Sequence, residues 1–268
     1  MDGFKIVTRK RGKKKQFATT VNCKETYFVS GDNHIASTVK RKALSAKETL
    51  CCTDFYTEMK GKVEECTKKV NGPDKSLGEI VTYGLGNFAE CLISRYQLAL
   101  LLALREDLQI PPSDVLLYDP KFFMAEKEVL SDFGFHVLSE NEEGKRQCGS
   151  STLFYMPHCG KSLYNNLLFA NWSPDRLHHV IIIGNSFTNM VQNVPSSTMK
   201  KCAPLIMKIQ PYAEEILLPG NFQYEDVFND TVIHLFPQGK LNLLDTEFWE
   251  HCPEPKYDQE DLEFIPKS

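Results

Sequence analysis

Short apolar segments recur between residues 79 and 187, and longer stretches with a helical pattern separate them. The clearest segment is residues 180–183, a valine followed by three isoleucines. A strand with apolar side chains on both faces must be covered on both faces, which is typical of a parallel sheet between two helical layers. The alternation therefore predicts an α/β fold with a Rossmann-like, mostly parallel sheet and helices on both faces.

The same pattern locates the individual elements. Runs rich in β-branched and aromatic residues predict strands at residues 79–83, 114–120, 135–138, 151–157, 179–187, 213–218 and 230–236. Helical spacing predicts helices at about residues 87–107, 122–133 and 163–172, with a further short helix after Ser173 and Pro174, a favourable N-cap and first-turn pair. The first of these helices contains the apolar run 98–104, so it should be enclosed by protein.

The segment before the first strand also has a helical pattern. Residues 37–70 contain one glycine and no proline, and Asn71, Gly72 and Pro73 then form a strong stop signal. We expect an N-terminal helical extension that covers the core, because its apolar stripe must be buried; a partner-binding helix is the alternative. The expected organisation is a basic, disordered tail (1–36), the helical extension (37–72), the Rossmann-like domain (73–250) and a loosely held acidic tail (251–268).

Charge is distributed unevenly along the chain. Residues 1–15 carry seven basic side chains and one acid, a net charge of +6, and because the whole chain carries −4 the remainder carries −10. An acidic body is a poor match for a nucleic-acid backbone. The basic arm is expected to be a solvated tail, with nuclear localisation or contact with RNA as the alternative.

Cysteine usage and apolar run length indicate the compartment. The nine cysteines include no Cys-x-x-Cys pair, which argues against a structural zinc site, and the scattered thiols favour a reducing compartment. The run 98–104 is far shorter than the ~20 residues that span a bilayer, and the first residues lack the apolar core of a secretory signal. We expect a cytoplasmic protein that does not enter membranes, with the nucleus as a second location.

Glycines and polar residues gather where the expected strands end. In an open parallel sheet the carboxyl ends of the strands form the ligand crevice. The candidates at these ends are Gly84, Gly86, Asn87, Asp119, His158, Cys159, Asn185 and Ser186.

The first two strand ends resemble a nucleotide-binding turn. The two glycines would let the backbone approach a ligand closely, and Asp119 stands where dinucleotide and adenosylmethionine folds place a ribose-binding acid. However, Glu90 replaces the third glycine of the fingerprint, and Asp119 follows Gly86 by 33 residues rather than ~20. A tight turn without a ligand is therefore the alternative.

Three further features suggest chemistry, each with a simpler explanation. Arg95 would be costly to bury unpaired, so we expect it to contact an acid such as Asp119 or an anionic ligand. His158 and Cys159 are candidates for a nucleophile or a metal site, although adjacent side chains usually point apart and a packed loop is the alternative. Cys252 precedes a proline, a pair found in some haem-responsive proteins.

Asn185 and Ser186, near the end of the fifth expected strand, allow two interpretations. They either hydrogen-bond a ligand or cap the next helix, and a cap requires fewer assumptions.

Seven sequence blocks between about residues 75 and 237 occur in an order that resembles the "sensitivity to red light reduced" (SRR-like) domain family. The basic run at residues 7–12 is similar to the leader of that family. The blocks are Tyr83-Gly84-Leu85-Gly86, Ser94-Arg95-Tyr96-Gln97-Leu98, Tyr118-Asp119-Pro120, Phe154-Tyr155-Met156-Pro157-His158-Cys159, Leu163-Tyr164-Asn165-Asn166-Leu167, Asn171-Trp172 and Gly184-Asn185-Ser186-Phe187.

The resemblance implies a regulatory protein rather than a characterised enzyme. Plant members are associated with light input to the circadian clock, and animal members with clock-gene expression and haem biosynthesis, through protein partners that the resemblance does not name. It assigns no catalytic residues. The crevice is expected to bind adenosylmethionine or another nucleotide-like ligand, or haem. The alternatives are an adenosylmethionine-dependent methyltransferase-like enzyme and a haem or metal sensor that uses His158, Cys159 or Cys252.

Overall fold

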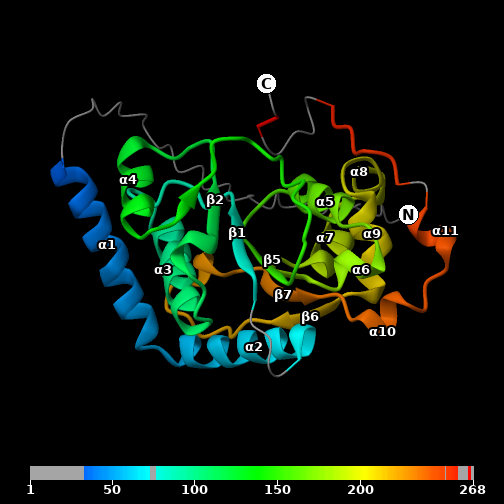
Figure 1. Ribbon diagram of the computed structural model, residues 1–268, viewed down its shortest axis with the longest axis horizontal. Coiled ribbons are helices and arrows are strands. Elements are labelled where there is room, and N and C mark those ends of the chain that lie inside the picture. The colour runs from blue at the N-terminus through cyan, green and yellow to red at the C-terminus, as the bar shows by residue number, and fades with distance from the viewer. Residues whose placement is uncertain (1–32, 73–76, 251, 259–264, 267–268) are drawn as a thin grey trace, which may run out of the picture. The chain divides into compact units, whose positions relative to one another are not determined.

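The computed structural model of the protein describes residues 33–72, 77–250, 252–258 and 265–266 (Figure 1). The basic arm at residues 1–15, including the leader-like run, lies outside the described residues.

A mixed seven-stranded sheet forms the centre of the described fold. Its strands are β1 (Glu79–Tyr83), β2 (Val115–Tyr118), β3 (His136–Val137), β4 (Thr152–Met156), β5 (Val180–Asn185), β6 (Glu214–Leu217) and β7 (Thr231–Leu235). They lie in the order β3-β2-β1-β4-β5-β7-β6. The first five in that order are parallel, whereas β7 is antiparallel to both of its neighbours. The predicted Rossmann-like, mostly parallel α/β fold is confirmed.

Helices precede, connect and follow the strands. The α-helices among the described residues are α1 (Asn33–Cys51), α2 (Asp54–Asn71), α3 (Leu92–Asp107), α4 (Met124–Asp132), α5 (Lys161–Ala170), α6 (Pro174–Leu177), α7 (Phe187–Asn193), α8 (Ser196–Cys202), α9 (Pro204–Ile209), α10 (Gln238–Leu241) and α11 (Thr246–Trp249). None of them is long and apolar enough to cross a membrane.

The sheet separates two apolar clusters, and β5 contributes to both. Ile181 and Ile183 pack on the face covered by α1 to α4, whereas Val180 and Ile182 pack on the face covered by α5 to α9 (Figure 1). All four side chains are fully buried, and burial of each stabilises the fold by about 1.5–3 kcal/mol. This two-sided burial is why the strand contains no polar side chain in that run.

The N-terminal helical extension is part of the first apolar cluster. Leu50 of α1 and Phe55, Met59 and Val63 of α2 are almost fully buried there. Lys60 of α2 also forms a 2.8 Å ion pair with Asp107 at the end of α3. The extension therefore covers the core, as its apolar stripe predicts.

The helix predicted to begin at residue 87 begins instead at Leu92. Gly84 and Gly86 have φ values of 68° and 76°, in the left-handed region that cannot continue into an α-helix. The Asn87 side chain then accepts a hydrogen bond from the Glu90 amide at 3.1 Å, which closes a separate turn. Residues 84–91 thus form a loop between β1 and α3, here called the β1–α3 loop.

The described part of the C-terminal acidic tail contacts the domain. Lys201 forms an ion pair with Asp258 at 2.7 Å, and Lys145 with Glu254 at 2.7 Å. The Tyr257 hydroxyl hydrogen-bonds to the Asn166 side chain at 2.7 Å. Residues 252–258 therefore lie against the domain rather than leaving it.

Candidate functional site

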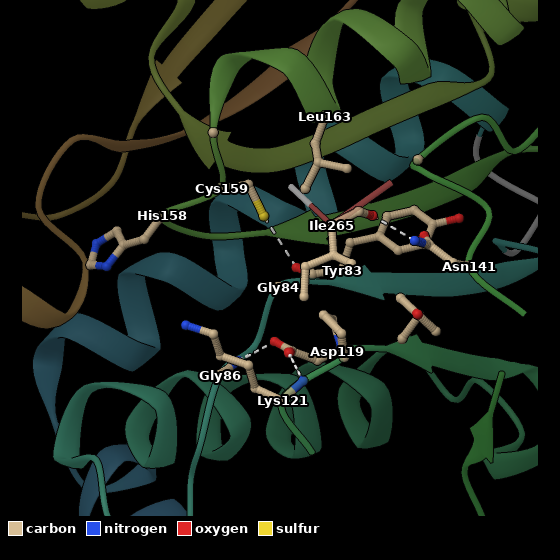
Figure 2. Close-up of a pocket in the computed structure, with 14 residues that line it drawn as sticks. Tyr83, Gly84, Gly86, Asp119, Lys121, Asn141, His158, Cys159, Leu163 and Ile265 are labelled. Carbon is tan, nitrogen blue, oxygen red and sulfur yellow. Dashed lines mark hydrogen bonds between the residues drawn. The ribbon is translucent and has the colours of Figure 1, made fainter. Parts of the chain in front are cut away.

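A cavity of about 480 Å³ lies at the carboxyl ends of β1, β2 and β4 (Figure 2). The chain reverses its direction of strand addition between β1 and β4, and such switch points are where open α/β sheets bind ligands. The lining residues are Tyr83, Gly84, Gly86, Tyr118, Asp119, Pro120, Lys121, Asn141, Gly144, His158, Cys159, Gly160, Leu163 and Ile265.

The cavity includes some of the residues predicted from sequence and leaves others outside its lining. Strand-end glycines Gly84 and Gly86 line it, together with Asp119, His158 and Cys159. The lining does not include Asn87, Arg95, Asn185 or Ser186. Their hydrogen bonds, described below, explain what these four side chains do instead.

Asp119 joins the loops that follow β1 and β2. Its Oδ2 accepts the Gly86 amide at 2.7 Å, and its Oδ1 accepts the Lys121 amide at 2.8 Å (Figure 2). The side chain is buried, so these charge-assisted hydrogen bonds are made away from bulk water. Both oxygens are thus engaged by the protein's own backbone.

A second buried carboxylate, Glu126 of α4, holds the other end of the β1–α3 loop. It accepts the Ala89 amide at 2.9 Å and the amide of Phe123, the residue before α4, at 3.0 Å. Burial raises the pKa of Glu126, although these amides favour the ionised form. Sequence reasoning missed this residue. A glutamate near the start of the expected helix was the available signal.

Arg95 fixes the same loop through its carbonyl groups. Its Nη2 donates to the Ala89 carbonyl at 2.7 Å, and its Nε donates to the Phe88 carbonyl at 3.2 Å. Arg95 therefore pairs with carbonyl groups of this loop, and the predicted contact with Asp119 is not formed. A guanidinium has five N–H donors in a fixed fork, so neighbouring carbonyls can serve as its partners.

Cys159 is a buried packing residue of the β4–α5 turn. Its thiol donates to the Tyr83 carbonyl at 3.2 Å, and a Cβ on Gly84 would lie only 2.7 Å from its sulfur. Burial raises the pKa of this thiol well above its ordinary value. The sulfur is therefore a neutral thiol that closes the contact between β1 and β4, and not a ready thiolate.

His158 is exposed and has a φ of 57°, which is uncommon for a residue with a Cβ. Its amide donates to Asn185 Oδ1 at 2.8 Å, and its Nδ1 lies 3.3 Å from Gln97 Nε2. Figure 2 shows the imidazole and the Cys159 sulfur pointing in different directions. Among the described residues, no group of three histidines, cysteines or acids is arranged to hold a metal.

Asn185 and Ser186 brace the fold beyond the cavity. Asn185 holds the β4–α5 turn through the His158 amide, and its own amide donates to the Tyr164 hydroxyl at 2.8 Å. Ser186 caps α7 by accepting the Asn189 amide at 3.0 Å, and its hydroxyl donates to Glu215 at 2.8 Å. Ser186 therefore caps a helix, as the second interpretation predicts.

Two buried asparagines join α5 to segments distant in the sequence, and the sequence analysis did not predict this role. Asn165 accepts the Leu205 amide at 2.9 Å, and Asn166 donates to the Glu143 carbonyl at 2.8 Å. Both side chains also reach the Tyr257 hydroxyl, at 3.2 and 2.7 Å. The available signal was a pair of adjacent amides inside an otherwise apolar helix, where each must find a partner.

Comparisons with known proteins place the chain in a family. The SRR1 domain matches residues 42–235. A mouse SRR1-like protein is 38% identical, covering 68% of this chain and 83% of the relative, and a Drosophila melanogaster SRR1-like protein is 30% identical, covering 80% and 74%. Protein SENSITIVITY TO RED LIGHT REDUCED 1 of Arabidopsis thaliana is 30% identical, covering 70% and 69%. No solved structure matches significantly. The chain belongs to the SRR1 domain family.

Proposed function

We propose that the chain is a regulatory protein that binds a small ligand in the strand-end cavity, and that it controls circadian clock-gene expression and haem biosynthesis. Membership of the SRR1 family supports a regulatory role, and the name of the Arabidopsis relative ties that protein to red-light sensitivity. The same proposal has it act through protein partners in the cytoplasm, with the nucleus as a second location.

The ligand-binding part of the proposal rests on the cavity at the switch point of the sheet. One residue on the rim of this cavity has a strained backbone conformation. Its volume of about 480 Å³ is within the range of ~300–1,000 Å³ typical of small-molecule sites. His158 keeps a left-handed conformation on that rim, and such conformations cost about 1–3 kcal/mol and cluster at functional sites. Asn185 and Gln97 hold the residue in place.

The surroundings of the reactive groups favour binding over catalysis. The Cys159 thiol is buried and donates to a carbonyl, and the oxygens of Asp119 accept backbone amides. Among the described residues, His158 has no carboxylate partner that would make it a stronger base. These arrangements stabilise loops and leave the cavity as a place to hold a molecule.

An adenosylmethionine-dependent methyltransferase-like enzyme is the second candidate, and the topology favours it. An antiparallel strand lies between β5 and β6 at the edge of an otherwise parallel sheet, as in the methyltransferases that use adenosylmethionine. Each carboxylate oxygen has two lone pairs, so Asp119 could accept a ribose hydroxyl as well as an amide. Topology alone does not determine function, and this candidate depends on a binding test.

Isothermal titration calorimetry of the full chain with adenosylmethionine, NAD and haem tests the ligand. The matched variants are Leu163→Trp, which fills the cavity, and Leu243→Trp, at a side chain that is 85% exposed. A ligand of the cavity should lose at least about tenfold in affinity with the first variant and keep its affinity with the second. Thermal unfolding confirms that both variants fold.

Binding weaker than about 1 mM, or roughly 4 kcal/mol, by all three compounds would remove the nucleotide and haem versions of the proposal. The regulatory part is tested in cells in which either variant replaces the native chain. We expect Leu163→Trp to alter the rhythm of a clock-gene reporter and the haem content, and Leu243→Trp to leave both unchanged. Normal values after complete removal of the protein would contradict the regulatory role.

A further inference from the structure

We propose that the cavity takes a small organic anion, with its carboxylate or phosphate group bound between Lys121 and His158 and its apolar body against Tyr118 and Leu163. This inference deepens the proposed function and rests on it, because it names the class of ligand for the same cavity. Some groups of the lining are already paired within the protein, and others are not.

The charged group that has no partner in the described part of the lining is a cation. Among the described residues, Asp119 is the carboxylate in the lining, and backbone amides occupy both of its oxygens. Lys121 is exposed, and its ammonium has no hydrogen-bond or ion-pair partner among the described residues. Figure 2 shows its side chain running from the end of β2 past Gly86, on the side of the cavity where His158 lies.

The contacts of His158 make its free ring nitrogen a donor. Gln97 is buried, and its Nε2 donates to the Val227 carbonyl at 3.1 Å, which orients the amide. The same NH₂ group therefore presents its other hydrogen to His158 Nδ1 at 3.3 Å, and that nitrogen must accept. In the neutral ring the proton is then on Nε2, which has no partner among the described residues and can donate to an oxyanion.

Helix α5 provides a third feature that favours an anion in the cavity. The rest of the lining determines the kind of molecule to which the anionic group is attached. The ten-residue helix begins after Gly160, which lines the cavity, so its positive dipole end lies at the cavity. Tyr118, Pro120 and Leu163 provide an apolar wall beside these donors. A neutral polar molecule would satisfy the wall but leave the Lys121 ammonium without a counter-charge.

Nuclear magnetic resonance of the full chain with isotope-labelled histidine provides the test. The probes are phenyl phosphate, benzoate and benzamide, which share a ring and differ in charge. The His158→Asn variant identifies the resonance, because asparagine tolerates the left-handed conformation better than most residues. We expect both anions to shift the His158 resonance saturably and benzamide to bind at least about tenfold more weakly.

The charge contribution is isolated by Lys121→Gln, with Lys127→Gln as the control because Lys127 is an exposed lysine on α4 outside the lining. Lys121→Gln should weaken both anions by about tenfold, and Lys127→Gln by less than twofold, since only Lys121 makes a charge-assisted contact. Lys121→Arg should restore most of the affinity. Tighter binding of phenyl phosphate or of benzoate decides which oxyanion the site prefers.

Equal binding of benzamide, or equal effects of the two lysine variants, would overturn the anion assignment. If benzamide binds the native chain but not Leu163→Trp, and the anions do not bind, the cavity is still a ligand site and only this inference fails. If neither these probes nor adenosylmethionine, NAD and haem bind, the ligand-binding part of the proposed function fails with it.

Discussion

The acidic and the basic groups near the strand ends differ in one respect. Asp119, Glu126 and Glu215 each have both carboxylate oxygens engaged by the protein's own donors. Lys121 and the free ring nitrogen of His158 have no such partner among the described residues. We call the first set the closed carboxylates and the second the open donors.

The difference separates residues that build the edge of the sheet from residues that can recognise a ligand. A closed carboxylate accepts hydrogen bonds from amides that would otherwise lose these partners, so its loss should cost stability. An open donor contributes little to the fold and keeps its hydrogen-bonding capacity for a ligand. Substitutions in the two sets should therefore affect different measurements.

The largest loss of stability is expected from Asp119→Ala. The change leaves the Gly86 and Lys121 amides without their acceptor, and hydrogen bonds to a charged group contribute about 1.5–3 kcal/mol each. We expect the free energy of unfolding, measured by urea denaturation, to fall by about 3 kcal/mol. A loss below about 0.5 kcal/mol would place Asp119 among the open groups and favour a role in ligand binding.

Glu215 should make stability depend on pH. Burial opposes its ionisation, but the hydrogen bond and charge of His234, with Ser186 and the Thr188 amide, lower its pKa to about 2 from 4.5. Because the folded-state pKa is depressed, the stabilisation is present above pH 4.5 and is lost as the pH falls towards 2.

The Glu215→Gln variant isolates this effect. We expect the native chain to lose on the order of 2 kcal/mol more than the variant between pH 5 and about 2, after allowance for solvent screening. Chemical denaturation at several pH values measures the difference. If the free energy of unfolding has the same pH dependence in both proteins, the Glu215 carboxylate does not make these hydrogen bonds in solution.

Much of the fold follows from local sequence, because burial on both faces leaves a continuous apolar run. The strand pattern therefore locates all seven described strands within a few residues. The antiparallel direction of β7 is not encoded in its own run of residues 231–235, since direction depends on how the long segment after β5 returns to the sheet. Local pattern also misplaced the start of α3, because Phe88 has the spacing of a helical residue.

The candidate site was predictable in position but not in role. Residue type and strand-end placement identify Asp119, His158 and Cys159 as lining residues. The partners that decide their roles come from distant parts of the chain, such as the Gly86 amide 33 residues before Asp119. Lys121 was missed because a lysine in a loop carries no signal until its neighbours are known to leave it unpaired.

A double-mutant cycle at Gly84 and Cys159 tests the close contact between the ends of β1 and β4. Gly84→Ala should cost about 1–2 kcal/mol, because its φ of 68° disfavours a side chain and the new Cβ would lie 2.7 Å from the sulfur. Removing the sulfur with Cys159→Ala should recover part of that cost, a coupling of about 1 kcal/mol. Additive effects in urea denaturation would mean that backbone conformation alone accounts for the glycine.

The smallest effect on stability is expected for the open donors, and it completes the comparison. Lys121→Gln and His158→Asn should each change the free energy of unfolding by less than about 0.5 kcal/mol, because both side chains are exposed and the contact that His158 loses is one hydrogen bond of 3.3 Å to Gln97. The same variants should lower the affinity for phenyl phosphate or benzoate by about tenfold. A stability loss near that of Asp119→Ala would show that these residues help to hold the edge of the sheet. In that case recognition would have to come from the remaining lining, chiefly Asn141 and the start of α5.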